Sequence, residues 1–338
     1  MTTKDQHLIW RKYLVPWTDD AATTKGNIAV YYKETNKEKE RKSICNIGCE
    51  KYTYDISSIT ENDKKVIQFY FDKWLQTQSN FNLKTAFVKS DKILERDYIE
   101  HNYIGVIEQK GIKMLQDLYV GRFPFDCPTI LDHVGEFLKF NILNRLLSND
   151  KLFSDDEISL LCDCALSQYD WVDKRYDFFE FLSVQMLRTW RSKENIFDSI
   201  NKTIEKFNDT SLKGTTQAMF PLMMMVNSQI LASALCKKNF YIELLNNETE
   251  HRFITGDFPI INLYADYDKV DESLDKMELY YPLTPRIAII CKNTISSNTT
   301  RTITSVCETD ELNKKIFNAA KKEVYAKCVE DLRMYCGK

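Results

Sequence analysis

The spacing of apolar residues changes twice along the chain. From about residue 60 to residue 237, apolar positions recur at steps of three and four, which is typical of amphipathic helices. The flanking parts carry short β-rich runs separated by polar turn residues, which is typical of strands and hairpins. The pattern predicts an α+β fold with a predominantly helical body and one small, mainly antiparallel sheet built from N- and C-terminal strands.

We expect a single domain over residues 1–338. Its parts are an N-terminal segment and β-hairpin (1–57), a helical body (58–239), and a β-hairpin, strand and closing helix (240–338). The nine glycines and seven prolines are few for a chain of 338 residues. This scarcity favours long helices over a β protein rich in turns.

Strands are predicted at both ends of the chain. Residues 27–33 predict a strand, the charge-dense residues 34–42 predict its solvent-exposed turn, and residues 44–54 predict a returning strand. Near the other end, the apolar runs on either side of residues 246–251 predict a second hairpin, which ends at Thr255-Gly256. Residues 309–335 predict one closing helix with a lysine-rich polar face.

The helical body divides into several segments. Helices are predicted at residues 104–118, 131–146, 177–191 and 211–237, with a capping box at residues 154–157. The most apolar stretch, residues 218–236, is long enough to be considered as a membrane span, but Asn227, Ser228 and Gln229 interrupt it. We expect a buried helix and no membrane contact.

Polar residues occupy positions where the helical pattern predicts core. Gln185 and Arg188 continue an apolar stripe, and Glu108 lies on the inward face of an earlier helix, near Gly111. A glycine inside a helix costs about 1 kcal/mol against alanine, so the close approach of another group at Gly111 is the expected explanation. A buried arginine needs a carboxylate or a ligand phosphate as its partner.

Asp257 ends the second predicted strand of the C-terminal hairpin and is followed by Phe258-Pro259. A carboxylate at a strand end more often faces a cleft than a core. Two interpretations stay open: Arg188 pairs with Glu108 or Asp257 in a structural ion pair, or a polar pocket gathers several such residues. The expected pocket contains His7, Glu108, Gln185, Arg188 and Asp257, whereas His101, His133 and His251 are given no role.

Charge and cysteine content restrict the classes of protein. The formal net charge of −3 gives no overall electrostatic attraction to nucleic acid. The ten cysteines include no C-x-x-C pair and no histidines at zinc spacing, so we expect reduced, mostly buried thiols. The first residues carry no apolar signal-peptide core, and we expect a cytoplasmic protein.

Several motifs appear in an order that resembles a known family. They are Gln6-His7 with Tyr13-Leu14, Gln185-Met-Leu-Arg188, Phe253-Ile-Thr-Gly-Asp257-Phe-Pro259 and Tyr281-Pro-Leu-Thr-Pro285. The chain resembles the mostly bacterial domain-of-unknown-function 4238 family, which commonly has Ser where this chain has Gly256 and Pro where it has Trp10. The resemblance implies a shared fold and a shared pocket but brings no known activity. Because Gly256 replaces that serine, we expect no serine chemistry.

Three functional hypotheses follow from the pocket. The first is a phosphodiester hydrolase, a nuclease-type effector in bacterial defence or a toxin system, acting on RNA, DNA or a nucleotide. Glu108 and Asp257 would hold Mg²⁺ or Mn²⁺ to activate water, and Arg188, positioned by Gln185, would neutralise charge on the phosphate. Without a metal, His7 would be the general base.

The other two hypotheses need no catalysis. In the second, the protein is a module that binds an operon-encoded protein partner or an anionic ligand, which Arg188 recognises. In the third, the five polar residues form a buried ion network that holds the fold together.

Overall fold

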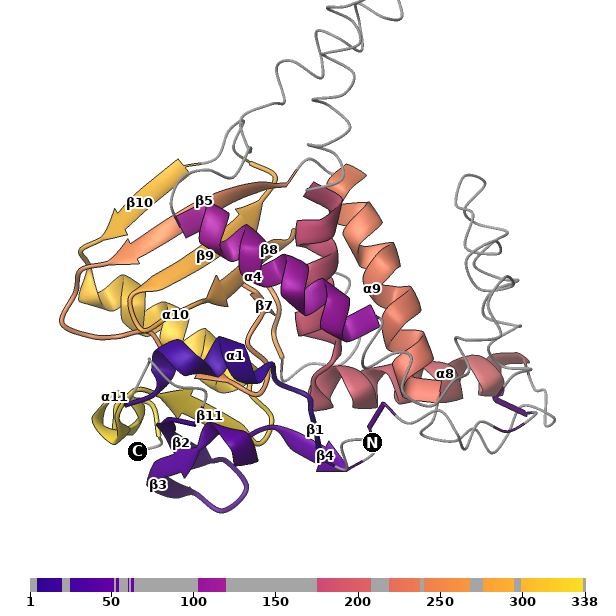
Figure 1. Ribbon diagram of the computed structural model, residues 1–338, viewed down its shortest axis with the longest axis horizontal. Coiled ribbons are helices and arrows are strands. Elements are labelled where there is room, and N and C mark those ends of the chain that lie inside the picture. The colour runs from indigo at the N-terminus through magenta and orange to yellow at the C-terminus, as the bar shows by residue number, and fades with distance from the viewer. Residues whose placement is uncertain are drawn as a thin grey trace, which may run out of the picture.

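The computed structural model describes residues 5–19, 25–51, 53–54, 60, 62–63, 103–119, 175–207, 219–237, 240–267, 276–294 and 299–336. The predicted helix at 131–146, the capping box at 154–157, His101 and His133 lie outside these residues. The described chain is mixed, with helices beside three separate sheets (Figure 1). The prediction of one small sheet is therefore wrong.

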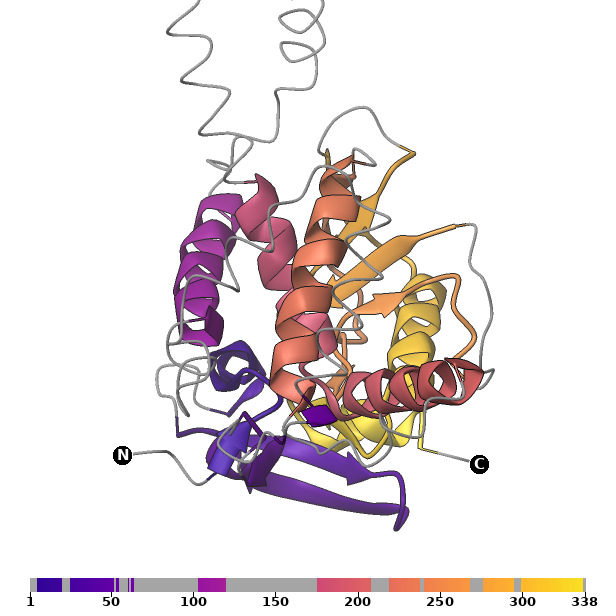
Figure 2. The same cartoon turned by 90° about the vertical axis from the view of Figure 1, so that its right-hand side faces the viewer.

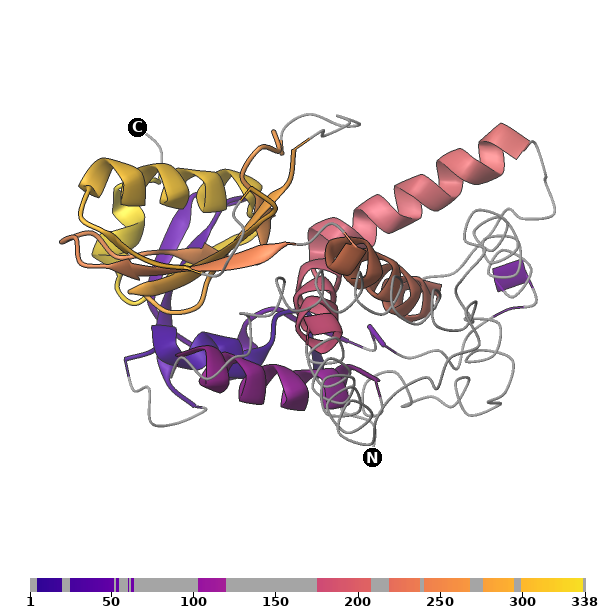
Figure 3. The same cartoon turned by 90° about the horizontal axis from the view of Figure 1, so that it is seen from above.

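The largest sheet has five strands in the order β10-β5-β9-β8-β7. Its central pairs, β5–β9 and β9–β8, are antiparallel, whereas β10 runs parallel to β5. Figure 3 shows α10 on one side of this sheet and α1 and α4 on the other. The strands are β5 (Tyr241–Asn247), β7 (Ile261–Asn262), β8 (Glu278–Pro282), β9 (Ile287–Lys292) and β10 (Thr299–Ile303).

A four-stranded sheet joins the two ends of the chain in the order β3-β2-β11-β6. Here N-terminal and C-terminal strands do pair, because β2 lies antiparallel to β11. The third sheet pairs β1 with β4. The strands of the two sheets are β1 (Asp5–His7), β2 (Asn27–Tyr32), β3 (Lys37–Ser43), β4 (Cys49–Lys51), β6 (Thr255–Gly256) and β11 (Glu323–Ala326).

An N-terminal hairpin forms, but its second strand is the charged run at residues 37–43 and not the predicted strand at residues 44–54. Residues 37–41 are exposed along β3, and the turn lies at residues 33–36, where Asn36 has a φ of 52°. Asparagine tolerates this left-handed conformation better than most residues. Because β3 is an edge strand, its alternating charges discourage pairing with another chain.

The predicted C-terminal hairpin does not form. β5 and β6 belong to different sheets, because the chain turns away after Asn247 and Thr255-Gly256 pairs with β11. The single closing helix is also wrong. It is divided into α10 (Val306–Ala319), the fully buried β11 and α11 (Val329–Arg333).

The described helices of the body agree with the predicted periodicity, except at one break. The predicted helix at 177–191 is two helices, one at residues 175–187 and one beginning at Trp190, with a turn at Arg188 and Thr189. The short N-terminal helices and the other body helices are α1 (Arg11–Leu14), η1 (Val15–Trp17), η2 (Ile44–Asn46), α4 (Gly105–Tyr119), α8 (Trp190–Phe207) and α9 (Met219–Lys237).

Two packing features position the site. The close approach expected at Gly111 is confirmed, because a Cβ there would collide with the ring of Phe181, so α4 lies directly on the helix at 175–187. Helix α9 contacts α8 beside it (Figure 2). Within the described chain, the Met219–Cys236 segment of α9 is long and apolar enough to cross a membrane, and 65% of it is buried inside the fold.

Candidate functional site

Arg188 lies at the turn between the two helices and is 3% exposed. Its Nη1 donates to the carboxylate of Glu108 on α4, and its Nη2 donates to the carbonyl oxygen of His7 on β1. Its Nε donates to Tyr54 Oη at 3.2 Å. All three guanidinium nitrogens therefore have protein partners.

The charge on Arg188 is balanced inside the fold. Burial alone would lower the pKa of Arg188, but Tyr54 and Glu108 together raise it above its ordinary value. The guanidinium therefore stays charged and paired. Tyr54 also donates to the His7 carbonyl at 3.1 Å, and its backbone amide donates to Gln6 Oε1 at 2.6 Å. These contacts connect strand β1 to the helix break.

The other two residues expected beside Arg188 behave differently. The imidazole of His7 lies against β4, where Nδ1 is 3.1 Å from the carbonyl oxygen of Ile47, so His7 meets Arg188 through its backbone. Gln185 is buried one helical turn before Arg188, and its amide nitrogen has no hydrogen-bond partner in the described chain. A buried donor without an acceptor costs about 1–3 kcal/mol.

Asp257 makes its hydrogen bonds elsewhere. Its carboxylate accepts the backbone amides of Lys321 at 2.7 Å, Lys322 at 2.5 Å and Glu323 at 3.0 Å, just before β11. Burial raises the pKa of Asp257 to about 6, although these three amides lower it. The structure thus brings His7, Glu108 and Arg188 together and places the Asp257 carboxylate on a separate loop.

The metal prediction has no direct support in the described part of the chain. There, no three His, Cys, Asp or Glu side chains lie close enough to hold an ion together. The two predicted ligands have other partners, because Glu108 meets a guanidinium and Asp257 meets three amides.

A cavity of about 330 Å³ opens beside Arg191, three residues after Arg188. Its walls come from one face of α8, from α9, from the end of the helix at 175–187 and from the segment after β6. Most of the lining is apolar, with small polar side chains among it. The lining residues are Met186, Leu187, Arg191, Ser192, Asn195, Ile196, Ser199, Ile200, Met223, Asn227, Phe258 and Tyr267.

Arg191 is fixed at the wall of this cavity. Its Nε donates to the Ala319 carbonyl and its Nη1 to the Tyr267 carbonyl, both at 3.0 Å. The guanidinium carbon lies 5.4 Å from the ring centroid of Tyr267 and 6.0 Å from that of Phe258. Its Nη2 has no protein partner among the described residues, so this nitrogen is available to a ligand.

Two lysines add positive charge near Arg191, and Asp257 holds the loop that carries them. Burial lowers the pKa of Lys321, and the charges of Arg191 and Lys322 lower it further. The ammonium of Lys322 lies 4.7 Å from the ring centroid of Trp190, the residue before Arg191. Asp257 therefore contributes to the positive cluster indirectly, through the backbone of residues 321–323.

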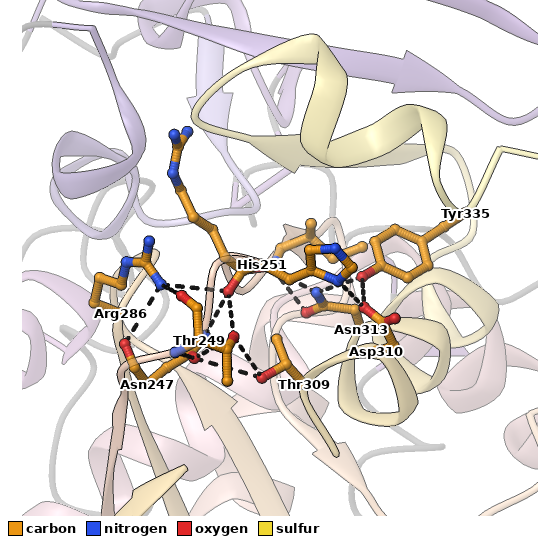
Figure 4. A network of polar contacts seen from close by, with 10 residues as sticks. Asn247, Thr249, His251, Arg286, Thr309, Asp310, Asn313 and Tyr335 are labelled. Carbon is orange, nitrogen blue, oxygen red and sulfur yellow. Dashed lines mark hydrogen bonds and ion pairs between the residues drawn. The ribbon is translucent and has the colours of Figure 1, made fainter. Parts of the chain in front are cut away.

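A polar network fixes the loop between β5 and β6 (Figure 4). His251 Nδ1 lies 2.7 Å from Asp310 Oδ1, which also accepts the Tyr335 hydroxyl at 2.6 Å. Asn313 accepts the amide of Ile254 at 3.0 Å. Most of these bonds end on backbone atoms or join α10 to the loop, so the network explains why the chain turns away after β5.

Comparison with known sequences gives one match. Residues 172–328 match the model of a family described as "Protein of unknown function (DUF4238)". The chain resembles this family. The match covers slightly less than half of the chain and includes Arg188, Arg191 and Asp257, whereas His7 and Glu108 lie before it. No curated protein and no solved structure matches the chain.

Sequence reasoning missed Arg191, Lys321 and Lys322. Arg191 follows the helix break that the periodicity did not show, and the two lysines were assigned to the polar face of a closing helix. The available signal was Phe258, the residue directly after Asp257. It places an aromatic ring at the wall of the cavity.

Proposed function

We propose that the protein binds a small organic anion that has an apolar part. The apolar part occupies the cavity between α8 and α9, and the anionic group accepts hydrogen bonds from Arg191 Nη2. The observation that carries this proposal is an arginine at the wall of a mainly apolar cavity, with one nitrogen that has no partner among the described residues. Ligand sites commonly combine apolar walls with a few fixed polar groups.

The surrounding charges support an anionic ligand. Burial is the largest cause of the lowered pKa of Lys321, and repulsion from Arg191 and Lys322 lowers it further. Two carboxylates compensate in part, because Glu34 raises this pKa and Glu194 pairs with Lys321. A bound anion would relieve the remaining repulsion, and a positive cluster would also attract such a ligand from solution.

The composition of the walls favours an aliphatic or aromatic anion over a sugar phosphate. Met186, Leu187, Ile196, Ile200 and Met223 offer no hydrogen bonds to hydroxyl groups. A ligand with many hydroxyls would lose its hydration in this cavity without compensation. We therefore expect a carboxylate, sulfonate or phosphate on an apolar body.

This proposal corresponds to the binding hypothesis, with Arg191 in place of Arg188 as the residue that recognises the anion. The hydrolase hypothesis requires Arg188 to meet a phosphate. Its guanidinium already meets Glu108, Tyr54 and the His7 carbonyl. These contacts favour the structural role for Arg188, because a phosphate would have to displace a half-buried carboxylate that is already paired with it.

The test blocks the cavity and measures binding of an anionic fluorescent probe. Asn195 and Ser199 are exposed on the cavity rim. We expect wild-type protein to bind 8-anilinonaphthalene-1-sulfonate with a fluorescence increase, and Asn195→Trp to weaken this binding at least tenfold. The matched control is Asp198→Trp, which places the same ring at an exposed position of α8 outside the cavity lining.

Three outcomes decide between the possibilities. Weakened binding in Asn195→Trp with unchanged binding in Asp198→Trp supports the cavity as the site. Equal binding by the wild type and both variants, with native circular dichroism, would overturn the proposal. Absence of binding by the wild type would overturn it as well.

A further inference from the structure

The pairing of β1 with β4 places a histidine directly opposite a cysteine. In the antiparallel register, His7 faces Cys49. Cys49 Sγ lies 3.3 Å from His7 Nδ1 and 3.7 Å from Nε2. Both residues are half-buried. This pair lies outside the Arg191 cavity and outside the matched family region.

Both strands are held in place by cations from the helix break. Arg188 donates to the His7 carbonyl, and Lys193 Nζ lies 2.7 Å from Glu50 Oε1 on β4. The tight turn before Cys49 uses Gly48 at a φ of 59°, and its carbonyl accepts the Leu8 amide at 2.7 Å. A side chain at Gly48 would collide with Ile9. The sulfur and the imidazole are therefore positioned before any reagent arrives.

The contacts of the imidazole identify the proton it holds. Nδ1 is 3.1 Å from the Ile47 carbonyl oxygen, which can only accept, so Nδ1 carries a hydrogen. Cys49 Sγ lies 3.3 Å from Nδ1 and 3.7 Å from Nε2, so the sulfur is beside the ring and not in line with this hydrogen. A protonated ring at this distance stabilises a thiolate by its positive charge, because an opposite charge within about 4–6 Å favours the charged form of a group.

Other groups around the sulfur act in the opposite direction. The carbonyls of Cys45 and Ile47 each lie 3.4 Å from Cys49 Sγ and accept the hydrogen of the neutral thiol. Glu50, the next residue, is paired with Lys193, and the Arg188 charge faces the His7 carbonyl. His7, in contact with the sulfur, is a group whose positive charge favours thiolate formation.

We propose that Cys49 is a selective site of mixed-disulfide formation with small disulfides, and that His7 stabilises its thiolate. The thiol first loses its proton to solvent, and the charge of the protonated His7 imidazole stabilises the thiolate. The thiolate attacks one sulfur of the disulfide, a new S–S bond forms and the original S–S bond breaks. The departing thiolate takes up a proton, so Cys49 is oxidised and the leaving sulfur is reduced.

The test uses the full chain and 2-hydroxyethyl disulfide, which is uncharged. The modification rate of each cysteine is measured by peptide mass spectrometry between pH 5.5 and pH 8.5. Cys307 is exposed and serves as the internal reference, and the buried Cys291 reports unfolding. We expect Cys49 to react at least tenfold faster than Cys307 at pH 6, because His7 stabilises the Cys49 thiolate at that pH. The ratio of the two modification rates should be smaller at pH 8.5, where Cys307 also forms more thiolate.

His7→Gln isolates the role of the imidazole. We expect this substitution to slow Cys49 about tenfold at pH 6 and to leave Cys307 unchanged. An unchanged Cys49 rate in folded His7→Gln, or a wild-type Cys49 no faster than Cys307 at pH 6, would overturn the proposal. If Cys291 becomes reactive in His7→Gln, that variant has unfolded. The ratio of the Cys49 rate to the Cys307 rate in the wild type, measured across the pH range, then tests the proposal.

Discussion

Two arginines three residues apart have opposite surroundings. Arg188 is buried, and its guanidinium nitrogens are all engaged, by Glu108, Tyr54 and His7. Arg191 is partly exposed beside a cavity and keeps Nη2 unengaged among the described residues. The sequence identified Arg188 because its helical position is inward. It could not identify Arg191, because the helix break changes which face each residue occupies.

Breaking the ion pair between Arg188 and Glu108 should lower the stability of the fold strongly. We expect Arg188→Met to lower the free energy of unfolding by about 3–5 kcal/mol, because it leaves the Glu108 carboxylate without its partner inside the fold. The double substitution Arg188→Met with Glu108→Gln should recover part of this loss. Urea unfolding followed by circular dichroism measures both.

The control is Arg333→Met, which removes the exposed ion pair with Glu38 and should change stability little. If Arg188→Met keeps the wild-type stability, the structural role of Arg188 is wrong. The pocket expected from the sequence would then be the better explanation of this arginine.

Asp257 predicts a pH dependence of stability. Its folded pKa of about 6 lies above the unfolded value of about 3.9, because burial disfavours the carboxylate. The folded chain therefore holds this proton more tightly. The contribution to stability is fully present below pH 4 and is lost as the pH rises through 6.

The measurement compares the wild type with Asp257→Asn, which cannot titrate at this position. The free energy of unfolding of the wild type minus that of the variant should fall by about 2 kcal/mol between pH 4.5 and pH 7.5. A difference that is constant, or that grows with pH, would show that the Asp257 carboxylate is not penalised by its burial.

At the scale of elements, helices and strands with a regular spacing of apolar residues could be predicted from the sequence. Elements whose structure depends on contacts with distant parts of the chain were missed. Helix α4 and the β2–β3 hairpin follow from local patterns. Strand β11 does not, because four buried residues lie between two helical segments and pair with strands distant in sequence. The separation of β5 from β6 likewise depends on side chains of α10, which no local pattern reveals.

The packing of α4 on the helix at 175–187 predicts that Gly111 cannot be replaced freely. Gly111→Ala would raise helix propensity by about 1 kcal/mol, yet its methyl group would collide with Phe181. We expect a net loss of about 1–3 kcal/mol in the free energy of unfolding, because overpacking outweighs propensity. Thermal and urea unfolding report the change.

A matched substitution on the same helix separates the two effects. Val106 is 45% exposed on α4, and Val106→Ala should change stability by less than about 0.5 kcal/mol. A stabilised Gly111→Ala would mean that α4 does not lie against Phe181.

At the scale of the whole molecule, the predicted pocket is divided in two. The β1–β4 ribbon and α4 surround Arg188, whereas β6, β11 and the start of α8 bring Asp257, the two lysines and Arg191 together. Sequence reasoning named site residues in both groups but missed Arg191 and the two lysines. It could not separate them, because their separation depends on which strands pair.

The measurement that tests the central claim most directly compares two probes that differ in charge. Calorimetry or fluorescence gives Kd for 8-anilinonaphthalene-1-sulfonate and for N-phenyl-1-naphthylamine, which lacks the sulfonate, with the wild type and with Arg191→Gln. We predict that the wild type binds the sulfonate at least tenfold more tightly, and that this preference disappears in folded Arg191→Gln. Equal affinity of the wild type for the two probes, or a preference that persists in Arg191→Gln, would contradict the account.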